Sequence, residues 1–252
     1  GAEAGALAAT AAELADRAGN DAILGFALDV AGTVFGAAGD VERMRASYDR
    51  ALGRLGHGAA RLARAIVAQN YAASLGKAGL HEEASARLRV AAHAAADLPM
   101  PHLVAVVRAN LATALLATGR ASEAMPLLED SLAESRRLGD LASAAKHAEE
   151  LALACAIGGD GIRAERLLDE AYGVGAAPSI ALRRVWAALA RGEVEVARSR
   201  MASALALAPD PRARAEVLAL TVGLAHRIGD RAWVERTAGS ALAALDGRPE
   251  LA

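Results

Sequence analysis

A glycine that returns at a fixed interval is the feature that most constrains how this chain can fold. Gly39, Gly79, Gly119 and Gly159 each lie 40 residues after the one before, and a similar pattern of apolar residues surrounds each of them. Self-similarity with a period of about 20 to 50 residues is typical of proteins that stack one small structural unit many times. Each unit then contacts mainly its neighbours, so a chain of 252 residues needs no single globular core.

The residues around each glycine predict a pair of helices. In the second unit, apolar residues at the helical spacing i, i+3, i+4 and i+7 are Ala68, Tyr71, Ala72 and Leu75. Gly79 then tolerates the left-handed turn that ends a helix. Ala84 and Leu88 mark one face of a second helix, which we expect to close at Pro99 and Pro101 because proline disfavours helix in the residue before it.

Small residues recur at the point where the two helices of a pair would cross. They are Gly32, Ala72, Ala112 and Ala152, again 40 residues apart. A large side chain at this position would hold the two backbones apart, so the pattern predicts close packing within each pair.

The same pattern sets the expected domain organisation. Two further units follow at shorter spacing around Gly192 and Gly229, and Ala238 and Ala241 complete the last of them. Residues 21–252 are therefore predicted to form about six helix pairs, and residues 1–20 the second helix of a truncated repeat. The apolar face of that lone helix could join two copies of the chain in a homodimer.

Composition agrees with an all-α fold. Hydrophobic residues make up 54% of the chain but aromatic residues only 3%, and the apolar content is mostly Ala, Leu and Val. Ala and Leu are strong helix formers. No run of β-branched residues bounded by turn residues predicts a strand.

Charge, cysteine content and hydropathy narrow the expected partners. A formal net charge of −2 argues against direct nucleic-acid binding, which needs a basic face. The single cysteine, Cys155, cannot form an internal disulfide, which favours a reducing, cytoplasmic location and a core thiol. No apolar run reaches the roughly 18 residues of a membrane span.

No group of residues predicts catalysis, a cofactor or a metal. None of the six histidines pairs with another His or Cys at i+3 or i+4, and no HExxH or CxxC motif occurs. Glu149 and Glu150 are adjacent carboxylates, but neighbouring residues of a helix do not face each other. We therefore predict that the chain is not an enzyme.

The spacing of these residues resembles the tetratricopeptide repeat (TPR), whose pattern is Trp-x2-Leu-Gly-x2-Tyr, then Ala-x3-Phe, then Pro, over about 34 residues. Tyr71, Leu75, Ala84 and Leu88 take the bulky or small positions, and the resemblance covers about residues 21–246. The aromatic positions are mostly Leu or Ala here, and the period is longer. The resemblance implies a right-handed α-solenoid of TPR-like helix-turn-helix repeats.

The longer repeat, with a linker such as Arg137-Leu138-Gly139-Asp140, resembles the TPR arrays of large bacterial regulators, the MalT-like or LuxR-type and the nucleotide-switch transcriptional regulators. In that family the array receives a ligand or partner, and an ATPase module and a helix-turn-helix do the rest. The resemblance therefore implies the receiving part of a signalling regulator.

In a TPR array the first helix of each pair lines a concave groove, which implies where a partner would bind. The polar first-helix residues expected to contact a protein or peptide are Asp29, Thr33, Gln69, Asn70, Lys77, Asn110, Thr113, Lys146, Glu149, Glu150 and Arg183. An Asn side chain offers a donor and an acceptor, so Asn70 and Asn110 could clamp a peptide backbone, or could have a purely structural role. The alternative function is the sensing of a small effector in the same groove.

Overall fold

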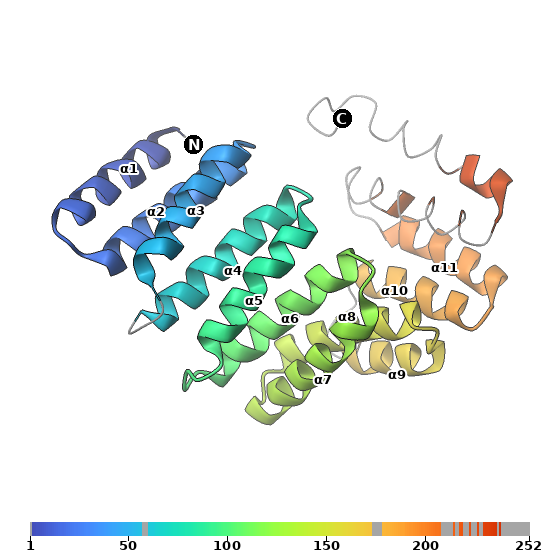
Figure 1. Cartoon of the computed structure of the whole chain (residues 1–252). Helices are drawn as coiled ribbons and strands as arrows, with labels where there is room; N and C mark the ends of the chain where they lie inside the picture. The colour runs from blue at the N-terminus through green and yellow to red at the C-terminus, as the bar shows by residue number, and fades with distance from the viewer. Residues whose placement is uncertain are drawn as a thin grey trace. The chain divides into compact units, whose positions relative to one another are not determined.

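The computed structural model describes residues 2–56, 60–172 and 178–207, together with scattered residues between 214 and 237 (Figure 1). The regular structure of these residues is helical, without a strand. The helices are α1 (Ala2–Arg17), α2 (Asp21–Ala37), α3 (Val41–Leu55), α4 (Arg61–Lys77), α5 (His81–Ala95), α6 (Pro101–Ala117), α7 (Ala121–Leu138), α8 (Leu141–Ile157), α9 (Gly161–Tyr172), α10 (Pro178–Ala190) and α11 (Val194–Leu207). Ala238 and Ala241, assigned above to the sixth repeat, lie outside the described residues.

The chain forms two compact units, residues 1–147 and residues 148–252. In the first unit α2 packs on α3, α4 on α5 and α6 on α7, and α3 and α5 also pack on the first helix of the following pair. In the second unit α10 packs on both α9 and α11. The all-α solenoid of TPR-like helix-turn-helix repeats is therefore confirmed.

Short turns of two or three residues join many of these helices. The recurring glycines have positive φ, for example 78° at Gly39 and 76° at Gly79, as the sequence predicted. Where an Asp follows the glycine, its carboxylate caps the next helix: Asp40 Oδ1 accepts a hydrogen bond of 3.0 Å from the backbone N–H of Arg43, and Asp140 does the same for Ser143. The glycine ends one helix and the Asp begins the next, which keeps each turn short.

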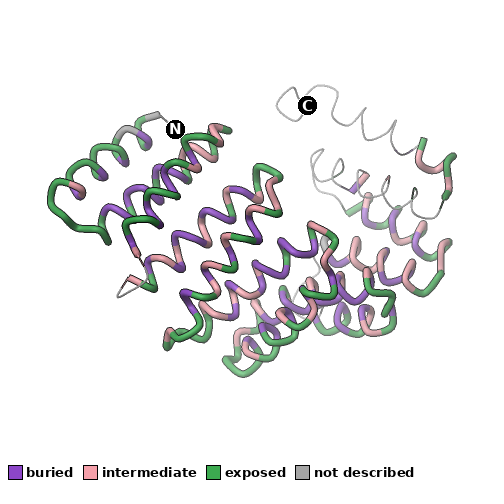
Figure 2. The backbone as a smooth tube through the Cα atoms, in the orientation of Figure 1, coloured by how far each residue is buried: buried purple, intermediate pink, exposed green. Residues whose placement is uncertain are grey.

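Buried residues recur along the paired helices, which pack on each other to form the core (Figure 2). Gly32 shows why the crossing position must be small: a Cβ there would lie 2.6 Å from a ring carbon of Tyr48. The equivalent Ala72 and Ala112 are 2% and 0% exposed. The predicted close crossing is thus confirmed in the first unit.

The prolines act differently from the sequence prediction. Helix α5 ends at Ala95, before both prolines, and Pro101 is the first residue of α6. Proline is favoured at that position because its missing N–H would have no partner there and its fixed φ suits a helix. Pro101 therefore starts a helix rather than ending one.

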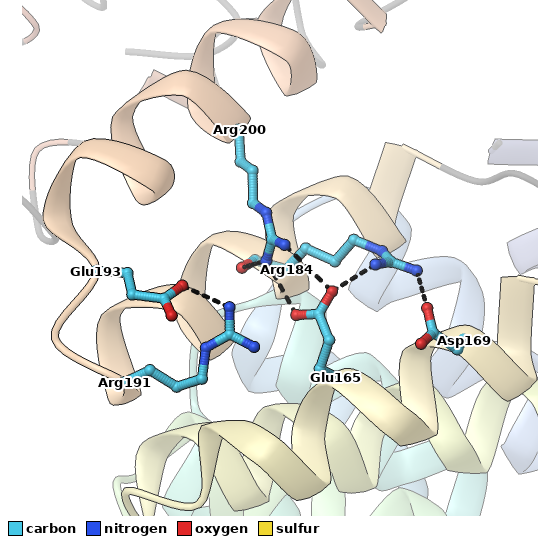
Figure 3. A network of polar contacts seen from close by, with 6 residues as sticks. All are labelled: Glu165, Asp169, Arg184, Arg191, Glu193 and Arg200. Carbon is cyan, nitrogen blue, oxygen red and sulfur yellow. Dashed lines mark hydrogen bonds and ion pairs between the residues drawn. The ribbon is translucent and has the colours of Figure 1, made fainter.

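An ion-pair network holds the helices of the second unit together (Figure 3). Glu165 of α9 accepts hydrogen bonds from Arg184 of α10 and from Arg200 of α11, the latter at 2.9 Å. Arg200 also donates to the backbone carbonyl of Arg184 at 2.9 Å, and Arg184 reaches Asp169 at 2.6 Å. One carboxylate, 16% exposed, thereby links three helices.

None of the described helices combines the length and the apolar character that crossing a bilayer requires.

Candidate binding pocket between the first helices

A pocket of about 400 Å³ opens between the first helices α4 and α6 of the first unit. Four of the predicted groove residues line it: Gln69, Lys77, Asn110 and Thr113. The rest of the lining is mostly apolar and includes Ala72 of α4, Ala84 and Leu88 of α5, and Ala114 of α6. This α4–α6 pocket has the size and the mixture of apolar wall and few polar groups that ligand sites have.

Two carboxamides in the pocket lack partners. The Oε1 atom of Gln69 is buried and has no hydrogen-bond partner in the described part of the chain. The Asn110 side chain is half-buried and makes no hydrogen bond with the described residues. A buried polar atom left unsatisfied costs about 1–3 kcal/mol, so a ligand that donates to Gln69 would recover that free energy. Thr113, by contrast, donates to the carbonyl of Ala109 at 3.0 Å.

The mouth of the pocket carries unbalanced positive charge. Lys77 is exposed, and its ammonium makes no ion pair with the described residues. His81, the first residue of α5, also lines the pocket, and the lining includes no carboxylate. The carboxylates that follow in α5 are paired elsewhere, Glu83 with Arg45 at 2.5 Å and Glu82 with Arg120 at 3.7 Å. Lys77 is thus available to an anionic group of a ligand.

We call the region between two successive first helices a joint. At the neighbouring joint, between α2 and α4, two other predicted groove residues bind each other. Asn70 donates through Nδ2 to both carboxylate oxygens of Asp29, at 3.2 and 3.0 Å. Asp29 is 8% exposed, and this burial raises the pKa of its carboxyl above 3.8, while the hydrogen bond from Asn70 acts in the opposite direction. The two residues that we expected to contact a ligand therefore contact each other.

Thr33 belongs to the packing between the same helices. Its hydroxyl lies 2.8 Å from the phenol oxygen of Tyr48, which also lies 3.2 Å from the hydroxyl of Ser74. Tyr48 stacks on Tyr71 with ring centroids 4.7 Å apart, and burial raises the pKa of its phenol. These contacts give Thr33 a structural partner within the protein.

The remaining predicted residues lie on α8 and α10. In the second unit Arg183 donates to Glu150 at 2.5 Å and to the backbone carbonyl of Glu149 at 3.0 Å. Arg183 and both glutamates are only 15–17% exposed, so this cluster is largely occupied internally. Lys146 is exposed on α8.

The repeat register shows that the Asp29/Asn70 contact and the Gln69/Asn110 pair of the pocket occupy equivalent positions. Gln69 lies 40 residues after Asp29, and Asn110 lies 40 residues after Asn70, so the two pairs occupy equivalent positions. At the first joint the pair meets and α2 packs directly on α4. At the second joint the equivalent pair faces the α4–α6 pocket instead.

Sequence reasoning missed His81 and the apolar floor of the pocket, because it considered first-helix residues alone. The constant separation of 41 residues in Asp29/Asn70 and Gln69/Asn110 was a usable signal for the paired positions. Among the residues that the structure describes, no group of three or more His, Cys, Asp or Glu side chains could hold a metal ion.

Comparison with known proteins shows similarity of fold. No family model and no curated protein matches this sequence. BtubC from P. vanneervenii matches with a TM-score of 0.65 and 18% identity, over 85% of this chain and 91% of that chain.

Two other solved structures extend the comparison. Nearly identical TPR-like repeats from Podosopora anserina match at a TM-score of 0.60 and 20% identity, over 71% of this chain and 92% of that one. The Rap conjugation gene regulator of plasmid pLS20, in complex with the Phr* peptide, matches at 0.61 and 16% identity, over 93% of this chain and 66% of that one. The chain therefore has the fold of a TPR-like repeat array.

Proposed function

We propose that this chain is a protein- or peptide-binding repeat scaffold, without enzymatic activity, whose recognition site is the α4–α6 pocket. The observation that carries the proposal is the buried, unpaired Oε1 of Gln69 beside the unpaired Asn110 in a mostly apolar pocket. A peptide offers an amide donor for Gln69, a carbonyl acceptor for Asn110 and an apolar side chain for the apolar part of the lining. The similar fold of a regulator solved in complex with a peptide supports the proposal.

A pocket-filling variant tests this function. Ala73 is exposed and lines the pocket, so Ala73→Leu narrows it without disturbing the core. Ala86→Leu is the matched control, because Ala86 is an equally exposed helical residue outside the lining. Short random peptides displayed on phage are selected against the wild-type chain, and their Kd is measured by fluorescence anisotropy.

We expect selected peptides to bind Ala73→Leu at least about tenfold more weakly than the wild type, and to bind Ala86→Leu unchanged. Peptides that bind Ala73→Leu as well as the wild type would contradict the proposal, because they would not use the pocket.

The second candidate is the sensing of a small effector in the same pocket, which its volume of about 400 Å³ favours. Such a ligand would raise the melting temperature of the wild type in a screen of metabolites, since binding to the native state stabilises it. The same ligand would raise the melting temperature of Ala73→Leu by a smaller amount. A screen without such a pocket-dependent hit, beside a positive peptide selection, would decide for the scaffold.

We also propose that the chain is the receiving part of a larger cytoplasmic bacterial transcriptional regulator, as its repeat linkers suggest. In this reading α1 is the second helix of a repeat, and it packs on α2 as α5 packs on α6. Leu7 and Leu14 of α1 are 65% and 60% exposed and would form the homodimer contact. Light scattering of Leu7→Gln/Leu14→Gln tests that contact: a dimer should become a monomer.

A further inference from the structure

The residues that line the α4–α6 pocket indicate which peptides it would select. The inference that follows rests on the proposed function. We propose that it binds an extended peptide segment in which an apolar side chain and a hydrogen-bonded backbone amide lie about three residues from an acidic side chain.

The floor of the pocket selects the apolar side chain. Ala72, Ala84 and Leu88 are 2%, 2% and 4% exposed, and together they give the pocket an apolar wall. Removal of apolar surface from water then favours an aliphatic or aromatic group at this point.

The two carboxamides select the peptide backbone. Asp29 and Asn70, at the equivalent positions of the previous joint, bring an acceptor and a donor together across neighbouring first helices. Gln69 and Asn110 are an acceptor and a donor at the equivalent positions of the next two first helices, and both line the pocket. A peptide group inserted there would donate its N–H to Gln69 Oε1 and accept through its C=O from Asn110.

The mouth selects the acidic group. Lys77 makes no ion pair with the described residues, His81 also lines the pocket, and no carboxylate does. Since Glu82 and Glu83 have arginine partners, Lys77 is left to pair with an acidic group of a ligand.

The length of α4 sets the spacing between these two contacts. Lys77 lies eight residues after Gln69, which is about 12 Å along a helix at 1.5 Å per residue. An extended peptide advances about 3.3–3.6 Å per residue, so the acidic side chain belongs about three residues from the hydrogen-bonded amide. The carboxylate of a chain terminus and the amide N–H of the same residue lie too close together to make both contacts.

A set of peptides with acetyl and amide caps tests the proposal directly. Each carries one Leu and one Glu, separated by zero to four serines in either order, and each has a twin in which Gln replaces Glu. Their affinities for the wild type, Lys77→Gln and Lys146→Gln are measured by fluorescence anisotropy at low and high salt. Lys146 is the only other lysine of the sequence and lies outside the pocket, so it is the matched control.

We expect the best affinity at two or three intervening residues, and a loss of about tenfold when Gln replaces Glu. Lys77→Gln should cause the same loss, and the two changes together should cost no more than either alone, because they remove one interaction. Lys146→Gln should leave the affinity unchanged.

Equal binding of the Glu and Gln peptides would overturn the inference, as would equal effects of the two lysine substitutions. A gain in affinity from an uncapped carboxyl terminus at every spacing would also overturn it, in favour of a terminal clamp. If none of the capped peptides binds, the inference fails as well, and the selection against Ala73→Leu shows independently whether pocket binding fails with it.

Discussion

At the scale of single residues, Tyr48 connects the packing of the first two repeats. Its ring is fully buried and stacks on Tyr71 of the next repeat, with an interplanar angle of 10°. Its hydroxyl is held between Thr33 and Ser74. The ring is therefore contacted at its edge and on its face, and these contacts oppose its movement away from a larger residue at Gly32.

This fixed ring makes Gly32→Ala a sharp test. The added Cβ would lie 2.6 Å from Tyr48 Cε2, so we expect the free energy of unfolding to fall by about 1–3 kcal/mol in urea denaturation. Gly53→Ala is the control, because Gly53 lies in α3 with open space around it. It should stabilise the chain by about 0.5–1 kcal/mol through helix propensity. Equal changes in unfolding free energy for the two substitutions would mean that the ring of Tyr48 moves to accommodate the added methyl group.

The buried carboxyl group of Asp29 predicts how the stability of the chain depends on pH. Burial raises the pKa of its carboxyl above 3.8, so the folded state holds this proton more tightly than the unfolded state. Its contribution to stability is fully present below about pH 3.8 and is lost as the pH rises through the folded-state pKa. Asp29→Asn keeps an acceptor for Asn70 without the charge. It should raise the urea midpoint at pH 7, with a smaller gain at pH 4.

Glu13→Gln is a suitable control for this pH test, since Glu13 is exposed on α1. It removes a charge in the same unit without changing a buried contact, so its effect should be small at both pH values. A gain for Asp29→Asn that is constant with pH would show that the carboxylate charge is not its cause.

At the scale of elements, the second unit depends on one glutamate. Glu165 of α9 accepts from arginines of α10 and α11, and it is 16% exposed, whereas Asp169 binds Arg184 at 65% exposure. Glu165→Gln leaves Arg200 without a counter-charge among the described residues and Arg184 with the exposed Asp169, so we expect a loss of about 1–3 kcal/mol in unfolding free energy.

The matched variant Asp169→Asn removes a carboxylate from the exposed edge of the same network. It should cost at most about 1 kcal/mol in the same denaturation assay, because water and salt screen the interaction. A larger loss for Asp169→Asn than for Glu165→Gln would contradict the assignment of Glu165 as the central acceptor.

The elements also show how far sequence reasoning reaches. The helices, their glycine ends and the small crossing residue Gly32 follow from periodicity and backbone conformation, which act within one repeat. The contact of Asp29 with Asn70 depends on how closely two successive first helices approach, and no pattern within one helix encodes that separation. The same reasoning therefore found Gln69 and Asn110 but could not foresee which of the equivalent pairs would meet.

At the scale of the whole molecule, the α4–α6 pocket lies entirely within the first unit. In a repeat array, stability is a sum over repeats and their nearest neighbours. Residues 1–157, which end with α8, should therefore fold alone, with a helical circular dichroism spectrum. They should bind the selected peptides within about threefold of the full chain. A folded fragment that no longer binds them would place part of the site in the second unit.

The glycine turns have a consequence for what can replace them. Gly79 has a φ of 76°, and a Cβ added there would meet nothing within 4 Å. Handedness, not volume, therefore excludes L-alanine from this turn. The mirror-image residue D-alanine prefers this region of φ and would fit the same space. A semisynthetic chain carrying it at position 79 should unfold at higher urea concentration, because the unfolded chain would have less freedom to lose.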